Sequence, residues 1–218
     1  MITIQSSSAR LRCVKRSIER SEDLLELIIT DVRVLCGVRN FSFQSVPLRL
    51  VGGERHEDIH AWYSWTPSEC SIVAEIPDSF GDSIGAFGLA VLAHEYFHLI
   101  LKKNDALVVL LDECVKEYRK MFAAVVYLEK GISARKLFEE LIISSFIPEG
   151  YLAEKHLNLV VMGAHEATDL SSLRRLVAAR VASSAKEYVE SARQIDRTYL
   201  GRILEVIDGL ELKTPQST

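Results

Sequence analysis

Residues 88–101 read Gly-Leu-Ala-Val-Leu-Ala-His-Glu-Tyr-Phe-His-Leu-Ile-Leu, a run that is apolar on nearly every side except at His94, Glu95 and His98. A helix that is apolar all round is typical of the buried interior of a domain. Polar side chains without partners are costly in such a place. We therefore expect residues 84–102 to form a buried helix whose three polar side chains belong to one site.

The spacing of these polar residues, His-Glu-x-x-His, indicates a metal site. Residues four apart lie on one helix face, so the imidazoles of His94 and His98 can point at a common centre, and Glu95 lies beside it. A metal would use the imidazole lone pairs and give the carboxylate a bound water to hold. The motif therefore predicts Zn²⁺ bound by His94 and His98. The alternative is a metal-free helical protein in which the motif is coincidental.

Composition bounds the class of protein. The chain has 218 residues, of which 48% are hydrophobic and 26% charged, as expected for a soluble globular protein with a sizeable core. A net charge of −4 with scattered basic residues argues against nucleic-acid binding. We expect no secretory signal and no membrane span. Four cysteines without close pairing favour reduced thiols in a cytoplasmic protein.

The hydrophobic periodicity predicts an α+β fold, mostly helical with a small mixed β-sheet. Apolar residues at three- and four-residue steps indicate one long helix at 9–36, which covers a face of the domain or, alternatively, forms a dimer. Three short runs of strand character lie within 41–76, and the last two are spaced as a hairpin. A helix at 105–130 follows the histidine helix, and residues 148–218 read as an all-helical C-terminal region.

Residues 111–118, Leu-Asp-Glu-Cys-Val-Lys-Glu-Tyr, lie on the helix after the histidines. Together with the His-Glu-x-x-His motif they resemble the gluzincin-type zinc metallopeptidases, in which an Asn/Asp-Glu pair on the next helix completes the zinc site. The resemblance covers about residues 45–125 and implies a zincin-like domain over 1–147. It implies Glu113 as the third ligand. Glu117 is either a hydrogen-bond partner of a zinc histidine or the rival ligand.

The resemblance implies hydrolysis of peptide bonds, with an endopeptidase favoured because no anchor for a substrate amino terminus is recognisable. Zinc would lower the pKa of a bound water, and Glu95 would act as the general base. An extended peptide could add to an edge strand at Ala61, Trp62 and Tyr63. The main alternative is a non-proteolytic zincin-like protein that keeps the metal and binds a peptide or a regulatory partner.

The sequence offers several candidates for the residue that would stabilise the oxyanion. Members of this superfamily commonly use a downstream Tyr or His. The resemblance therefore offers Tyr151, His156 and His165 as candidates, although none lies in a recognisable motif. His56 and His60 read as structural or solvent-facing residues.

Overall fold

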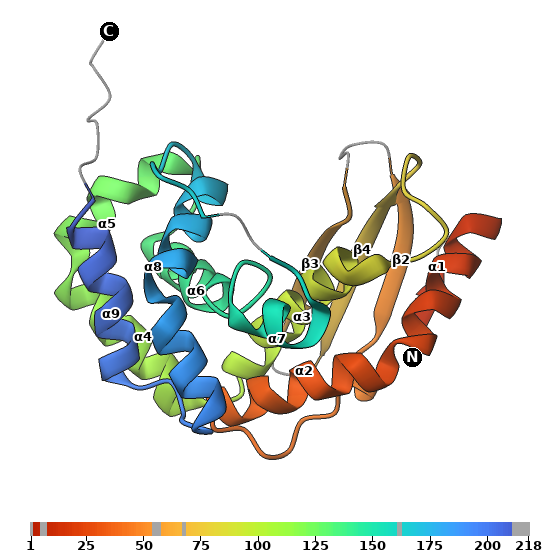
Figure 1. Cartoon of the computed structure of the whole chain (residues 1–218), viewed down its shortest axis with the longest axis horizontal. Coiled ribbons are helices and arrows are strands. Elements are labelled where there is room, and N and C mark those ends of the chain that lie inside the picture. The colour runs from red at the N-terminus through yellow and green to blue at the C-terminus, as the bar shows by residue number, and fades with distance from the viewer. Residues whose placement is uncertain (1, 5–7, 54–57, 67–68, 161–162, 211–218) are drawn as a thin grey trace, which may run out of the picture.

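The computed structural model describes residues 2–4, 8–53, 58–66, 69–160 and 163–210, and it confirms the α+β class. A small sheet lies at one end of the molecule and most helices of the second half gather at the other (Figure 1). The helix α2, Glu22–Leu35, runs along the base between them. His56 lies outside the described residues.

The sheet has the order β1-β2-β4-β3 and is mixed, as the sequence predicts. Strands β1 (Ile2–Ile4), β2 (Leu48–Gly53) and β4 (Cys70–Pro77) are parallel to one another. Strand β3 (His60–Trp65) lies at the edge and pairs antiparallel with β4. The predicted hairpin is confirmed by β3 and β4, in which Tyr63 lies opposite Ile72. Strand β1 was not anticipated, because three residues are too few to show an alternating pattern.

The predicted long helix at 9–36 is wrong in one respect, since the structure divides it at Ser21 into α1, Ala9–Arg20, and α2. The Ser21 hydroxyl donates to the carbonyl of Ser17 (3.0 Å), and its backbone N–H bonds to the carbonyl of Ile18. Such local bonds compete with the regular helical ladder. Helix α1 packs on β1 and β2, and α2 packs on the histidine helix.

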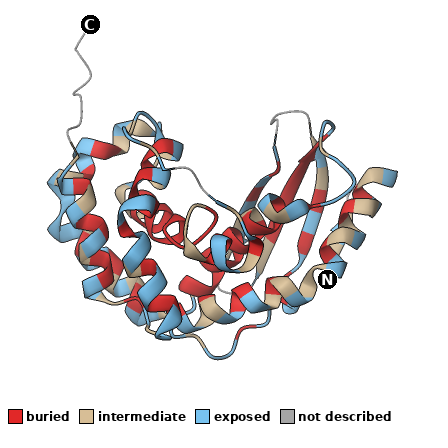
Figure 2. Cartoon of the chain, viewed as in Figure 1, coloured by how far each residue is buried: buried red, intermediate tan, exposed pale blue. Residues whose placement is uncertain are grey.

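The histidine helix, α3, spans Gly85–Leu101, which confirms the prediction to within a residue at each end. Every residue from Leu92 to Leu101 is buried, and the burial colouring shows this helix inside the molecule (Figure 2). It packs against β3 and β4 on one side and against α2, α6 and α7 on others. The apolar surroundings that the sequence indicated for the histidines are therefore present.

The helices of the second half are shorter than predicted. They are α4 to α9, at Asp105–Glu117, Arg119–Val125, Ala134–Ser144, Tyr151–Leu157, Leu170–Glu190 and Arg197–Asp208. The predicted helix at 105–130 divides at Tyr118, where the backbone leaves helical geometry (φ −100°, ψ 25°). Helix α6 is enclosed by α3, α4, α8 and α9. Helices on both sides of residue 147 thus pack together, and the predicted division there stays a prediction.

Two further expectations concern the chain as a whole. The structure shows all four cysteines as free thiols, with Cys36 and Cys114 buried. Within the described ranges, every helix is too short or too polar to cross a membrane.

Candidate metal centre

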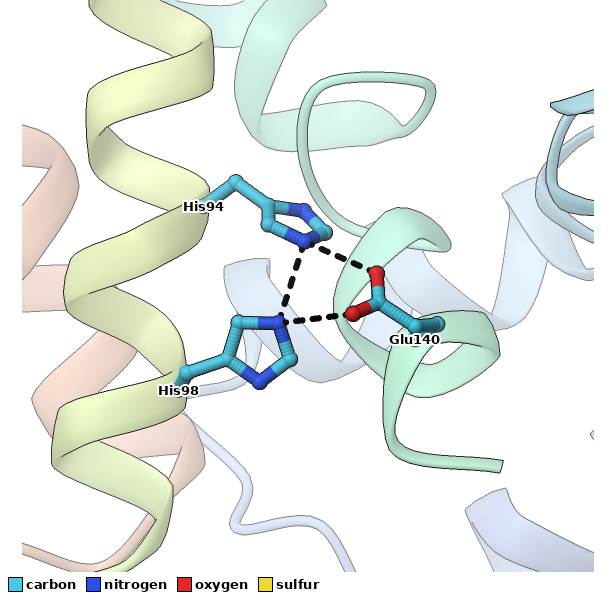
Figure 3. Close-up of side chains that lie close together, drawn as sticks. All are labelled: His94, His98 and Glu140. Atoms are coloured by element: carbon cyan, nitrogen blue, oxygen red, sulfur yellow. Dashed lines mark hydrogen bonds and ion pairs between the residues drawn. The ribbon is translucent and has the colours of Figure 1, made fainter. Parts of the chain in front are cut away.

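Two helices that are distant in sequence bring three possible metal ligands together (Figure 3). Helix α3 supplies His94 and His98, as predicted, and α6 supplies Glu140. The Nε2 atoms of the histidines lie 3.2 Å apart. Glu140 places Oε2 3.1 Å from Nε2 of His94 and Oε1 3.2 Å from Nε2 of His98. All three residues are buried, with exposed fractions of 5%, 0% and 9%.

The other ring nitrogens explain why both Nε2 atoms face this centre. Nδ1 of His94 donates to the carbonyl oxygen of Ile147 (3.0 Å), and Nδ1 of His98 donates to Oε1 of Glu139 (2.5 Å). A neutral imidazole that donates through Nδ1 has its lone pair on Nε2. Two lone pairs therefore converge on one another and on a carboxylate, an arrangement that needs a positive charge between them.

The spacing of the three acceptors suits a metal ion. A tetrahedral ion with bonds of about 2.0–2.1 Å holds its ligand atoms roughly 3.3 Å apart. The separations of 3.1–3.2 Å among the two nitrogens and the carboxylate oxygens are close to this value. Small side-chain movements would complete the coordination, and the hydrogen bonds at both Nδ1 atoms already orient the rings as in known metal sites.

Cations around Glu140 help to keep it ionised. Lys136 lies one helical turn before it and approaches Oε1 to 2.8 Å, while Arg174 of α8 lies 3.9 Å from Oε2. Burial alone would raise the pKa of Glu140. When no metal ion is bound, His94 and His98 can each carry a second proton on Nε2, and the hydrogen bonds and charges of these protonated rings hold the pKa of Glu140 far below its usual range. Glu140 is therefore a carboxylate, the form that binds metals.

Glu139 supports the centre from behind His98. It is 2% exposed and also forms ion pairs with Arg135 (3.0 Å) and Lys102 (3.6 Å). Burial would raise its pKa, yet the hydrogen bond from His98 and the surrounding positive charges lower the pKa of Glu139 to about 2. The ring of Tyr63, on β3, stacks on the His98 ring at 4.8 Å between centroids, and the Tyr63 hydroxyl donates to Oε1 of Glu139 (3.5 Å). His98 is thus held on two sides.

Glu95 lies beside the metal group and remains buried, with 8% exposed. Burial and the charge of Glu140 together raise the pKa of Glu95 to about 7, although the charges of His94 and Lys136 and a backbone hydrogen bond from Tyr63 oppose the shift. The Tyr63 N–H therefore donates to the Glu95 carboxylate from the edge strand. A carboxylate that can accept and release a proton therefore lies between the possible metal ligands and strand β3.

The structure does not bring the predicted third ligand, Glu113, into this group, and the carboxylate beside the two histidines is that of Glu140. Glu113 lies on α4 with 60% of its side chain exposed, 3.8 Å from Arg197 of α9. Glu117, the predicted rival ligand or histidine partner, is 49% exposed and pairs with the same arginine. The position that we assigned to Glu117 behind a zinc histidine is held by Glu139. The acidic pair on α4 makes surface ion pairs with α9.

The other predicted site residues are distributed unevenly. Tyr63 reaches the centre, whereas Ala61 is buried in the strand and Trp62 is 40% exposed. The oxyanion candidates are occupied elsewhere: Tyr151 donates to Glu190, and His156 bonds to Asp31. His165 lines a cavity of about 1230 Å³ beside α8 and α9.

A signal for Glu140 was present in the sequence. Residues 137–143 read Leu-Phe-Glu-Glu-Leu-Ile-Ile, so two carboxylates lie in an apolar run, just as the histidines do in α3. Buried charges are rare unless they are paired or bind a metal. The spacing gave no help, because Glu140 follows His98 by 42 positions and only tertiary packing brings the two together.

Comparisons with protein-family models, with curated proteins and with solved structures found no match for this chain.

Proposed function

We propose that the protein is a zinc-dependent hydrolase of peptide bonds. The observation that carries the proposal is the convergence of both Nε2 lone pairs and the Glu140 carboxylate on one buried point, with Glu95 next to it. A pair of structural histidines would need no second carboxylate beside the first.

The donor set suits zinc. Two imidazole nitrogens and one carboxylate oxygen are a common ligand set for a catalytic zinc ion, which keeps a further coordination position open. When bound, such an ion lowers the pKa of water and polarises a carbonyl group. His94, His98 and Glu140 would hold the ion, and Glu139 and Ile147 would fix the orientation of the two rings.

Glu95 would move the protons of the reaction. In hydrolysis, the oxygen of a water molecule adds to the peptide carbonyl carbon while Glu95 accepts one of its protons. The electrons of the carbonyl double bond pass to the carbonyl oxygen and return as the C–N bond breaks. Glu95 then delivers the proton to the departing nitrogen, so that one carboxyl and one amine product form. A carboxylate with a pKa of about 7 is suited to both transfers.

An extended peptide is the substrate that the sheet edge supports best. Strand β3 is one of the two edge strands, and antiparallel addition of a peptide there would place the peptide beside Glu95. The backbone of Ala61 and the carbonyl oxygen of Tyr63, whose N–H is bonded to Glu95, would supply contacts, and the half-exposed Trp62 would supply a surface for a substrate side chain. We also propose that the protein cleaves internal bonds of its substrate, as an endopeptidase does. We propose a cytoplasmic location, where the four free thiols would stay reduced.

Cleavage of a broad peptide library by the zinc-loaded protein tests the proposal. Glu95→Gln should retain zinc and lose turnover by at least about 10²-fold, since general-base catalysis contributes roughly that much. Glu113→Gln is the matched control, because it changes an exposed glutamate on α4 and should cleave normally. Equal cleavage by wild type and Glu95→Gln would end the proposed mechanism. Zinc uptake with no cleavage by wild type would favour a peptide-binding protein instead.

A further inference from the structure

The ammonium group of Lys136 lies against the metal group, although nothing in the sequence singles this residue out. Its Nζ atom is 2.8 Å from Oε1 of Glu140 and 3.4 Å from Nε2 of His98. It therefore contacts two of the three possible ligands directly. The backbone N–H of Lys136 bonds to the side chain of Ser133 at the start of α6 (3.1 Å), so the residue belongs to a well-ordered first turn.

The exposure of the surrounding side chains shows on which side of the metal group Lys136 lies. Its side chain is 39% exposed, compared with 11% for Glu140, 1% for His98 and 21% for Arg174. Of these side chains, that of Lys136 is the most accessible to solvent. A molecule that reached the ligands from solvent on this side would meet the ammonium group first.

The edge strand holds Lys136 at this position. Its Nζ atom lies 4.8 Å from the centroid of the Tyr63 ring, a cation–π contact. The backbone of Tyr63 in turn bonds to Glu95, and the ring stacks on His98. Lys136 is thus next to the general base, the metal ligands and the strand to which a peptide would add.

We propose that Lys136 is a catalytic residue that binds the carbonyl oxygen of the substrate and stabilises the negative charge that develops on it. This inference rests on the proposed hydrolysis and names its missing oxyanion-binding group. A cation that is already positioned is well suited to this task, because it needs little rearrangement as the charge develops. Tyr151 and His156, which the resemblance suggested, are bonded to Glu190 and Asp31.

A structural role is the competing explanation, because Lys136 could act only by holding Glu140 through their 2.8 Å contact. The two roles predict different results for ligands of the bound metal. A cation that stabilises developing negative charge should favour an anionic ligand over a neutral one. If Lys136 only positions Glu140, its substitution should alter metal uptake, or should weaken the binding of anionic and neutral ligands equally.

The experiment uses the full chain loaded with Co²⁺, whose visible spectrum reports on ligands that bind to the metal. Azide is the anionic probe and imidazole the neutral one. Lys136→Met should bind azide at least tenfold more weakly than wild type, while cobalt and imidazole affinities change less than twofold. Lys136→Arg should recover part of the azide affinity, because it restores the charge.

Lys102→Met is the matched control. Lys102 also lies over the Tyr63 ring (5.4 Å) and pairs with Glu139 (3.6 Å), but it has no contact with Glu140 among those the structure records. It should bind both probes as wild type does. Where the library yields a cleaved peptide, Lys136→Met should lower kcat by roughly 10²–10³-fold with little change in KM.

Several results would overturn the inference. Unchanged azide binding in Lys136→Met, equal weakening of azide and imidazole, or loss of cobalt would each show that Lys136 does not act on the bound anion. A wild-type protein that takes up no cobalt would overturn the metal site, and the inference with it. Selective loss of azide in a protein that cleaves no peptide would support Lys136 and contradict the peptidase proposal alone.

Discussion

Glu139 and Glu140 are adjacent residues that have separate tasks at the candidate centre. Glu140 faces both Nε2 atoms, whereas Glu139 accepts the Nδ1 hydrogen of His98 and is surrounded by Arg135 and Lys102. Adjacent positions on a helix point about 100° apart, so α6 can place one carboxylate in front of the histidines and the other beside them. The distinction leads to different expectations for their substitution.

We predict that Glu139→Gln lowers zinc affinity by about 10–100-fold without abolishing binding, because it weakens the group that orients His98. Competition with a chromophoric chelator measures this affinity. Asp112→Asn is the control, since Asp112 also pairs with Arg135 (2.7 Å) but is 61% exposed and does not contact His98. Unaltered affinity in Glu139→Gln would mean that the 2.5 Å contact does not orient the ring.

At the scale of elements, the end of α6 matters as much as its beginning. The carbonyl of Ile147, which orients His94, follows the last turn of this helix. The chain then doubles back so closely that a Cβ atom on Gly150 would lie 1.8 Å from the backbone oxygen of Ser145. Glycine is therefore required where the loop passes the helix end.

We predict that Gly150→Ala destabilises the protein by about 1–3 kcal/mol, the usual cost of overpacking, and weakens zinc binding because Ile147 must shift. Gly201→Ala provides the opposite control: a Cβ there meets no atom within 4 Å, and the residue lies inside α9. It should stabilise the protein by up to about 1 kcal/mol. Urea unfolding measures both, and a neutral Gly150→Ala would contradict this description of the loop.

A second contact between elements connects α2 to α7. Asp31 accepts hydrogen bonds from His156 and Lys155, each at 2.7 Å. Burial alone would raise the pKa of Asp31, but these two partners lower it below the usual value of 3.8. A carboxyl group whose pKa is lower in the folded state adds stability that is complete above the unfolded pKa and is lost as the pH falls through the folded pKa.

We predict that Asp31→Asn lowers the free energy of unfolding by about 1 kcal/mol at pH 7, because it removes hydrogen bonds to charged groups at a site that is 22% exposed. The difference from wild type should vanish at a pH below the lowered pKa of Asp31, where the carboxyl group is protonated in both states. Denaturant unfolding at the two pH values tests this. A difference that persisted at low pH would assign the effect to shape and not to charge.

For the whole molecule, the candidate centre joins its two halves. Helix α3 packs on the sheet, and α6 packs among the helices of the second half, so a metal between them would connect both groups of elements (Figure 1). Glu95, the proposed general base, and Tyr63 come from the sheet side, whereas Glu140 and Lys136 come from the helical side. The site is complete only when the two sides are packed together.

This division explains what could be predicted from the sequence. His94, Glu95 and His98 could be found because helical periodicity makes their relation local, and the β3–β4 hairpin is local for the same reason. Glu140 could not be found by spacing, since its place depends on packing between α3 and α6. The helix breaks at Ser21 and Tyr118 were also missed. The apolar series is interrupted at Ser21 but resumes at Leu25, and it continues across Tyr118, while the backbone leaves helical geometry at both residues.

Zinc content is the most direct test of the central claim, that His94, His98 and Glu140 hold one metal ion. Each protein is dialysed with zinc, freed of excess metal by gel filtration and measured by elemental analysis. Wild type and Glu113→Ala should each retain about one zinc per chain, and Glu140→Ala should retain almost none. Zinc retained by Glu140→Ala but lost by Glu113→Ala, or wild type free of zinc, would contradict the account.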